Sequence, residues 1–149
     1  MEINVEDNFT LLFDKNNNTA YKALQMLQKE CEKSDKVYCF MDKLADMIDS
    51  DNSYIRTRGL TLIAYNAKWD KENKIDEIID EYLKHIEDIK PITARQCIKL
   101  MPMIAKDKPE LKCDIVSALQ KADTSIYAES MQSLVYKDIQ NSLAEIEKL

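Results

Sequence analysis

The cysteines are the residues of this sequence that could bind a metal ion or a cofactor, or act as nucleophiles. Cys31, Cys39, Cys97 and Cys113 stand 8, 58 and 16 residues apart. These intervals match neither a C-x-x-C redox pair nor the ligand spacing of a zinc finger. Cys97 falls in an apolar helical register, where cysteine behaves as a small hydrophobic residue. We therefore expect free thiols, no metal site and no cofactor.

The single histidine, His85, is the next candidate for acid–base or nucleophilic chemistry. It falls on the polar side of a predicted helix, where we expect it to be exposed, and one histidine cannot form a two-histidine metal site. The carboxylates of residues 76–81 have the spacing of the solvated face of an amphipathic helix. With Gly59 as the single glycine, the chain has no glycine-rich phosphate loop. We expect no catalytic site and no enzymatic activity.

The arginines could recognise carboxylates, because a planar guanidinium donates two parallel hydrogen bonds. Arg58 and Arg95 occupy equivalent positions 37 residues apart, each after a turn that begins with an aspartate. We expect them to bond to a turn aspartate, Asp51 or Asp88, in a ladder between repeats. Arg56 precedes Arg58 by two residues, about 200° around a helix, so it should face elsewhere. A binding role for the arginines stays open beside this structural one.

The single tryptophan, Trp69, is followed directly by an acidic segment. Trp69 stands at the end of a predicted helix, where an amphipathic ring commonly seals the helix end against the next repeat. Residues 70–88 hold eight acidic and three basic residues. We expect this acidic face to provide solubility, with docking of a basic partner as the alternative.

Composition and charge limit the fold classes and the kinds of partner that this chain can have. One glycine and three prolines in 149 residues, with 45% hydrophobic residues, indicate an all-α chain with short loops. The formal net charge of -6 would repel a polyanion, so we do not expect a nucleic acid partner. The N-terminal residues do not resemble a secretory leader, and no apolar run reaches the roughly 18 residues of a membrane span. We expect a cytoplasmic location away from membranes.

A repeated pair of amphipathic helices organises the sequence. Apolar residues recur at i, i+3, i+4, i+7, i+8 and i+11 from Val37, and the same pattern returns from Ile75. A third copy with one polar exception begins at Leu111, and each copy leads into an aspartate-led turn and a second helix. The repeated unit is thus helix, turn, helix over 35 to 38 residues.

These copies predict an all-α fold, an α-α superhelix of about eight antiparallel helices in one domain, 1–149. The predicted segments are an eroded first repeat at 1–33, repeats at 35–70, 74–106 and 109–135, and a terminal cap helix at 136–149. One helix, expected over residues 91–105, contains Pro102. Because proline cannot donate to the carbonyl of Ile98, we expect a bend there.

Two fragments carry a resemblance to a known family. SYIRTRGLTLI and PITARQCIKL each follow an acidic turn with an aliphatic residue, an arginine and small apolar residues. This pattern resembles the second helix of HEAT repeats, and the resemblance covers most of residues 14–135. The whole chain is similar to short HEAT/ARM-like proteins of Gram-positive bacteria, some of which carry a name linked to iron–sulfur assembly.

The resemblance implies a scaffold whose second helices line a concave surface. We therefore expect a non-enzymatic interaction module, monomeric or weakly dimeric, that binds a protein or peptide on that surface. Two alternatives stay open. A HEAT-like enzyme, related to DNA-repair glycosylases or lyases, would need a catalytic pair, and an accessory factor in cofactor assembly would need cysteines that converge in space. The residues expected near the concave surface are Tyr54, Arg56, Arg58, Arg95 and Gln96.

Overall fold

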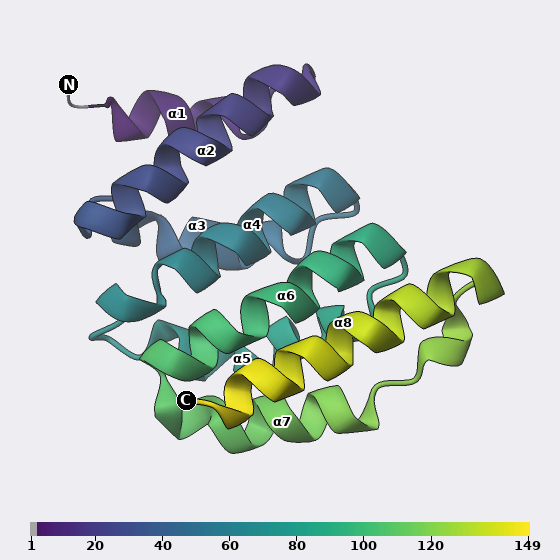
Figure 1. Ribbon diagram of the computed structural model, residues 1–149. Helices are drawn as coiled ribbons and strands as arrows, with labels where there is room; N and C mark the ends of the chain where they lie inside the picture. Colours follow the sequence, from purple (N-terminus) through teal and green to yellow (C-terminus); the bar gives the residue numbers. More distant parts are fainter. Residues whose placement is uncertain (1–2) are drawn as a thin grey trace. The chain divides into compact units, whose positions relative to one another are not determined.

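The computed structural model describes residues 3–149, which form α-helices joined by short turns and no β-strand (Figure 1). The all-α prediction and the predicted number of helices are confirmed for these residues. The eight helices are α1 (Val5–Leu11), α2 (Asn17–Lys33), α3 (Met41–Met47), α4 (Ser53–Tyr65), α5 (Lys74–Leu83), α6 (Pro91–Asp107), α7 (Lys112–Lys121) and α8 (Glu129–Glu147). Short 3-10 turns lie at Tyr38–Phe40, Ala67–Trp69, Lys84–Glu87, Pro109–Leu111 and Thr124–Ile126.

The helices divide into two compact units, Met1–Glu72 with α1 to α4 and Asn73–Leu149 with α5 to α8. The division falls between the repeats predicted at 35–70 and 74–106. In the first unit α2 contacts α1 and α4, and α3 packs behind α4 (Figure 1). In the second unit α6 contacts α7 and α8. We call α1, α3, α5 and α7 the A helices, and α2, α4, α6 and α8 the B helices.

Asparagine caps explain where three helices of the first unit begin. The side-chain oxygens of Asn4, Asn16 and Asn52 accept hydrogen bonds from backbone N–H groups in the first turns of α1, α2 and α4. Those N–H groups have no partner within the helix, so each cap satisfies donors that would otherwise lack one. The apolar stripe of α2 is buried and consists of Ala20, Ala23, Leu24, Leu27 and Cys31.

The first helix of the second unit follows most of its predicted stripe: four of the six apolar positions are buried, and Ile78 and Leu83 are half-buried. Ile75, Ile79, Tyr82 and Ile86 are buried, as the 3.6-residue period predicts. The expected exposure of His85 is wrong, because its side chain is only 14% exposed and its Nδ1 lies 2.7 Å from Oδ2 of Asp88. α5 ends at Leu83 and continues as the 3-10 turn Lys84–Glu87. The buried carboxylate of Asp88, three residues after His85, holds the imidazole against the protein and out of solvent.

The chain ends in one helix where the sequence predicted two. A separate cap helix was expected at 136–149, but α8 runs unbroken over Glu129–Glu147. No glycine or proline interrupts this segment, so nothing in it ends a helix at residue 135. The buried residues Val135, Asp138, Ile139, Ser142 and Ile146 continue one stripe along the whole helix.

Pro102 lies inside α6, and α8 supplies the hydrogen bond that proline cannot make. Proline has no N–H, so the carbonyl of Ile98 loses its partner within the helix. Oγ of Ser142 donates to that carbonyl at 2.8 Å, in a buried position. A serine in the apolar stripe of α8 thus compensates for a proline in α6. The bend expected at Pro102 stays a prediction.

This pairing predicts a conditional cost for the loss of Ser142. Ser142→Ala should lower the free energy of unfolding by about 1 to 2 kcal/mol, because it leaves the buried carbonyl of Ile98 without a donor. In a Pro102→Ala background the new N–H can donate to the same carbonyl, so the loss should be smaller. Urea unfolding of the two single variants and the double variant measures the coupling. Equal losses in both backgrounds would show that Ser142 does not replace the missing N–H.

Candidate functional site

Tyr54 and Arg58, one turn apart on α4, have opposite exposures. Tyr54 is 58% exposed, whereas Arg58 is buried. The guanidinium carbon of Arg58 lies 5.7 Å from the centre of the Tyr54 ring, within the range of a cation–π interaction. Burial lowers the pKa of the Arg58 guanidinium, and the interaction with Tyr54 opposes this shift. Arg58 therefore supports a tyrosine ring that faces solvent.

The fork of Arg58 is fixed by acceptors in the turn between α1 and α2. Nη1 donates to the carbonyl of Leu12 at 2.8 Å, and Nη2 donates to Oδ1 of Asn17 at 3.3 Å. The expected bond from Arg58 to a turn aspartate is therefore wrong. Leu12 caps the C-terminus of α1, where carbonyls lack partners within the helix and a positive charge is favourable. This end of α1 is the acceptor that a buried cation requires.

Arg56 forms hydrogen bonds to the turn that precedes its own helix, α4. Its Nη1 donates to the carbonyls of Ser50 at 3.0 Å and Asp51 at 3.1 Å, and the residue is buried. Arg56 thus faces a different neighbour from Arg58, as their separation on the helix predicts. Arg56 holds the backbone before α4, whereas Arg58 holds the turn between α1 and α2.

In the second unit the equivalent arginine binds an aspartate, but not the one expected. Arg95 donates to Asp138 of α8, through Nε at 2.5 Å and through Nη2 at 3.4 Å. This hydrogen bond raises the pKa of Arg95, and burial opposes the shift. The turn aspartate Asp88 instead accepts from the backbone N–H of Lys90 and contacts His85. Of the predicted partner-binding residues in this unit, Arg95 joins α6 to α8 and Gln96 is half-buried beside it.

The two-acceptor geometry of Arg58 predicts a measurable cost for a conservative exchange. Arg58→Lys keeps a positive charge but cannot reach both acceptors with a planar fork, so stability should fall by about 1 kcal/mol. Urea unfolding of the variant provides the measurement. The matched control is Lys29→Arg at an exposed position of α2, which should leave stability unchanged. An Arg58→Lys protein as stable as this control would contradict the role of the fork.

The far ends of α2 and α4 are also joined. Nε1 of Trp69 donates to the carbonyl of Cys31 at 2.7 Å, and Nζ of Lys68 donates to the carbonyl of Glu32 at 2.8 Å. Both acceptors lie in the last turn of α2, where carbonyls lack partners within the helix. Trp69 therefore seals a helix end, but that of the preceding repeat rather than the next one. We call the solvent side of α2 and α4, between the Asn17 and Glu32 ends, the B face of the first unit.

A family model now accounts for this architecture. Residues 2–143 match the model of the HEAT repeat domain. The chain belongs to the HEAT repeat family. HEAT repeats generally mediate protein–protein interactions. Comparisons with curated proteins and with solved structures give no match.

The thiols of this HEAT repeat protein are free and divided by burial. Cys31 and Cys97 are buried, whereas Cys39 and Cys113 are exposed. Burial raises the pKa of Cys31 to about 12 and raises that of Cys97 further, so these two thiols are protonated at neutral pH. Within residues 3–149, no group of three or more histidine, cysteine or acidic residues is arranged to hold a metal ion. No helix of this range combines the length and apolar character required to cross a membrane.

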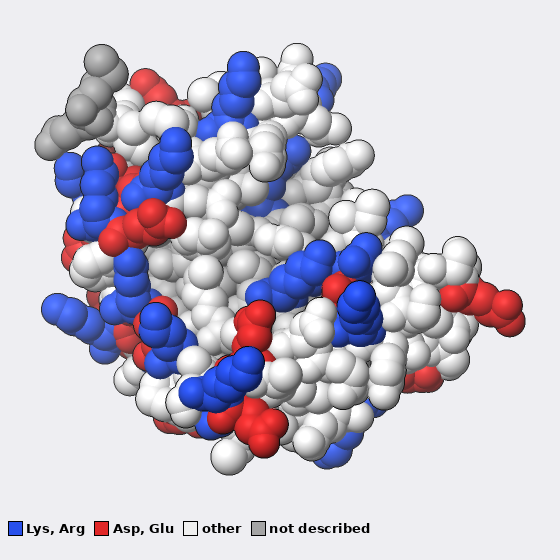
Figure 2. Space-filling view, in the orientation of Figure 1, with Lys and Arg blue, Asp and Glu red and all other residues white. Residues whose placement is uncertain are grey.

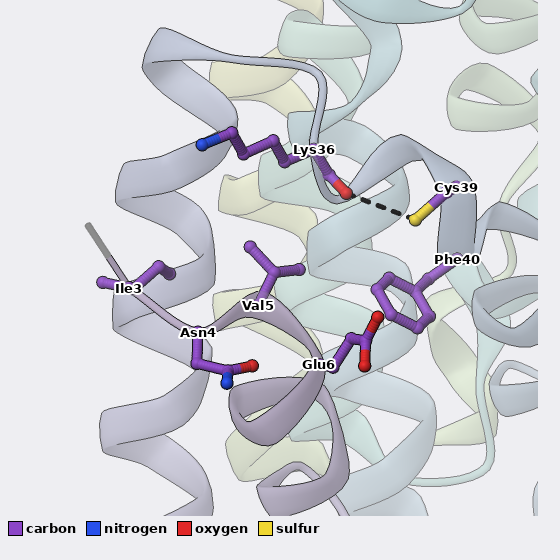
Figure 3. Close-up of a pocket in the computed structure, with 7 residues that line it drawn as sticks. All are labelled: Ile3, Asn4, Val5, Glu6, Lys36, Cys39 and Phe40. Atoms are coloured by element: carbon purple, nitrogen blue, oxygen red, sulfur yellow. Dashed lines mark hydrogen bonds between the residues drawn. The ribbon is translucent and has the colours of Figure 1, made fainter.

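An open hollow of about 570 Å³ lies where α1 meets the segment before α3 (Figure 3). It combines apolar side chains with one carboxylate, one ammonium group and one thiol. Sγ of Cys39 donates to the backbone carbonyl of Lys36 at 3.3 Å, rather than to a basic side chain. A thiol is activated by a neighbouring base, so this contact does not create a nucleophile. The lining residues are Ile3, Asn4, Val5, Glu6, Lys36, Cys39 and Phe40.

Proposed function

We propose that this HEAT repeat protein is a non-enzymatic interaction module that binds a protein or peptide through the exposed side of its B helices. Tyr54 carries the proposal. Among the residues expected to contact a partner, it is the one left more than half exposed, and Arg58 fixes its position. An exposed aromatic ring that is already held in place loses little conformational freedom on binding, which favours affinity.

The arginines contribute as supports in this proposal. Arg56 and Arg58 are buried and donate to backbone carbonyls of neighbouring turns, so they act by holding those turns and, for Arg58, the Tyr54 ring. Alanine scans of interfaces identify tyrosine and tryptophan, together with arginine, as the residues whose loss weakens binding most. Loss of Arg58 would weaken a complex by releasing Tyr54.

A similar arrangement supports a contact surface in the second unit. Ile92 is 73% exposed and lies three residues before Arg95 on α6. Leu134, also exposed, lies four residues before Asp138 on α8. Residues three or four apart share one helix face, and the Arg95–Asp138 bond brings these two faces together. Each unit thus presents an exposed aromatic or aliphatic side chain one turn from a fixed arginine.

The proposal also assigns the setting of the module. We place it in the cytoplasm of a Gram-positive bacterium, as a monomer or weak dimer with a protein partner rather than a nucleic acid or membrane. The concave B-helix surface of HEAT proteins provides the analogy for the contact surface. An enzyme or an accessory factor in cofactor assembly is the alternative, and it would require a catalytic pair or converging thiols.

Capture followed by reconstitution tests the proposal. The chain is used to capture proteins from its host, the captured protein is purified, and its dissociation constant is measured by calorimetry. Tyr54→Ala should weaken binding about tenfold or more, the effect of an interface hot spot, with an unchanged melting temperature. The matched control is Tyr136→Ala in α8, because Tyr136 is also 58% exposed. It lies two residues from Leu134, about 200° around the helix, and so faces away from the proposed surface.

Two outcomes would overturn the proposal. One is a purified partner that binds wild type, Tyr54→Ala and Tyr136→Ala equally well, which would remove the B helices from the interface. The other is a captured molecule that the chain converts chemically, which would make the protein an enzyme.

A further inference from the structure

The two helix layers of the first unit carry opposite charge. The B helices α2 and α4 hold five basic and two acidic residues, a formal net charge of +3. The A helices α1 and α3 hold one basic and four acidic residues, a formal net charge of -3. The chain as a whole carries -6, so α2 and α4 form a locally positive layer in an acidic protein. Of the charged residues of this layer, Lys22, Lys29, Lys33 and Glu32 are exposed, whereas Glu30, Arg56 and Arg58 are buried.

The lysines of this layer form an exposed stripe along α2. Lys22, Lys29 and Lys33 are exposed and follow at i, i+7 and i+11, so they share one side of the helix. Lys22 and Lys29 make no ion pair with any residue of 3–149, and Lys33 lies 3.7 Å from Glu30. Glu30 is buried, and the hydroxyl of Ser34 lowers the pKa of its carboxyl group. Figure 2 shows basic side chains over α2, with an acidic side chain near its end, beside a surface of uncharged residues.

Aromatic side chains flank the lysine stripe. Tyr21 is 56% exposed and lies one turn after Asn17. Asn17 accepts a hydrogen bond from Arg58, which in turn supports Tyr54. Tyr54 is therefore held at the junction of α2 and α4, and Tyr21 lies one helical turn along α2 from that junction. Met26, also exposed, lies between Lys22 and Lys29 on the lysine stripe.

We propose that the B face of the first unit binds an acidic segment of a partner protein that also carries aromatic or aliphatic side chains. The lysines would meet its carboxylates, and Tyr21 and Tyr54 would cover its apolar side chains. α2 has 17 residues. A helix of that length extends about 25 Å, which an extended segment of about eight residues would span. This inference rests on the proposed function and specifies the chemistry of the partner.

Charge complementarity selects an acidic partner over the alternatives. A basic segment would be repelled by the layer that carries the tyrosines and attracted to the A helices. A nucleic acid carries a phosphate at every nucleotide, so it would extend past three lysines onto the surface of a protein with a net charge of -6. A short segment with a few carboxylates matches the lysine stripe without that repulsion.

Selection from a display library of random peptides tests this chemistry without assuming a sequence. The full chain is immobilised, and enriched peptides are synthesised with a fluorescent label. We expect enriched peptides to combine acidic with aromatic or aliphatic residues. Their affinity, measured by fluorescence anisotropy, should fall as the salt concentration rises from about 0.05 to 0.5 M, because salt screens exposed charges.

Matched variants locate the peptide on the B face. Lys22→Glu with Lys29→Glu should weaken binding about tenfold or more. The control pair Lys121→Glu with Lys148→Glu makes the same charge change at exposed lysines of the second unit and should have no effect. Tyr21→Ala should also weaken binding, whereas Tyr21→Phe, which keeps the ring, should retain most of the affinity. The melting temperature of each variant verifies that it folds.

Three results would overturn the inference. The first is a selection that enriches basic peptides, neutral peptides or no peptides. The second is an equal loss of affinity from the two pairs of lysine substitutions, and the third is a single-stranded oligonucleotide that binds more tightly than the peptide and displaces it. None of these results would refute the proposal that the protein is an interaction module. The proposed interaction module is refuted only by a captured and purified partner that binds the Tyr54→Ala variant as tightly as wild type, or by a partner that the protein converts chemically.

Discussion

Replacing Ile79 with alanine is expected to lower the free energy of unfolding by about 2 to 5 kcal/mol. Ile79 is buried in α5, on the stripe that packs into the core of the second unit. The substitution removes buried apolar atoms and leaves a cavity, because packed neighbours relax only partly into the space. Urea unfolding followed by circular dichroism measures the loss.

The adjacent residue provides the control for Ile79. Asp80 is exposed on the same helix, so Asp80→Ala should change stability by less than about 0.5 kcal/mol. The two variants differ by one position along α5 and by about 100° around its axis. If both have the same small effect, Ile79 does not lie in a packed core, and the helical register derived from the sequence is wrong.

The core could be predicted because its signal is local and repeated. Val37, Leu44 and Ile48 are buried in the first unit, and Ile75, Tyr82 and Ile86 are buried at matching positions in the second. A period of 3.6 residues is visible within one helix, and the repeat shows the same period twice, so chance agreement is improbable. The family match over residues 2–143 agrees with this architecture.

The partners of the arginines could not be predicted in the same way. The acceptors of Arg58 lie 41 and 46 residues before it, whereas the acceptor of Arg95 lies 43 residues after it. Equivalent positions in a repeat share a helix face, but their neighbours belong to other helices with different side chains. The sequence therefore identified which arginines make structural hydrogen bonds, but it did not identify the acceptors of those bonds. The hydrogen bond of Ser142 could not be predicted for the same reason, since its role depends on Pro102 in another helix.

The residues expected to contact a partner illustrate a second limit. Helical position correctly separated Arg56 from Arg58, yet exposure could not be read from residue type. Long cationic side chains are usually exposed, and these two are buried because unpaired carbonyls lie within reach. Tyr54 remains on the surface, supported by the arginine that the sequence placed beside it.

Replacing Gly59 with valine is expected to lower the free energy of unfolding by about 3 kcal/mol, since overpacking at a rigid contact has that order of cost. Gly59 lies inside α4, where a Cβ atom would approach Cβ of Met47 to 2.8 Å and the carbonyl oxygen of Leu44 to 3.2 Å. Neither atom is the end of a flexible side chain, so α3 or α4 would have to move. Urea unfolding measures the loss.

Alanine at the same position separates the close approach from helix propensity. At an unhindered site inside a helix, glycine to alanine stabilises by up to about 1 kcal/mol, because alanine loses less backbone entropy. At Gly59 the contact with Met47 should outweigh that gain, so Gly59→Ala should destabilise the protein by about 1 kcal/mol, less than valine does. A stabilised Gly59→Ala protein would mean that α3 and α4 can separate freely here. Glycine at this position would then lower the stability of α4 without being required for the packing of α3 against α4.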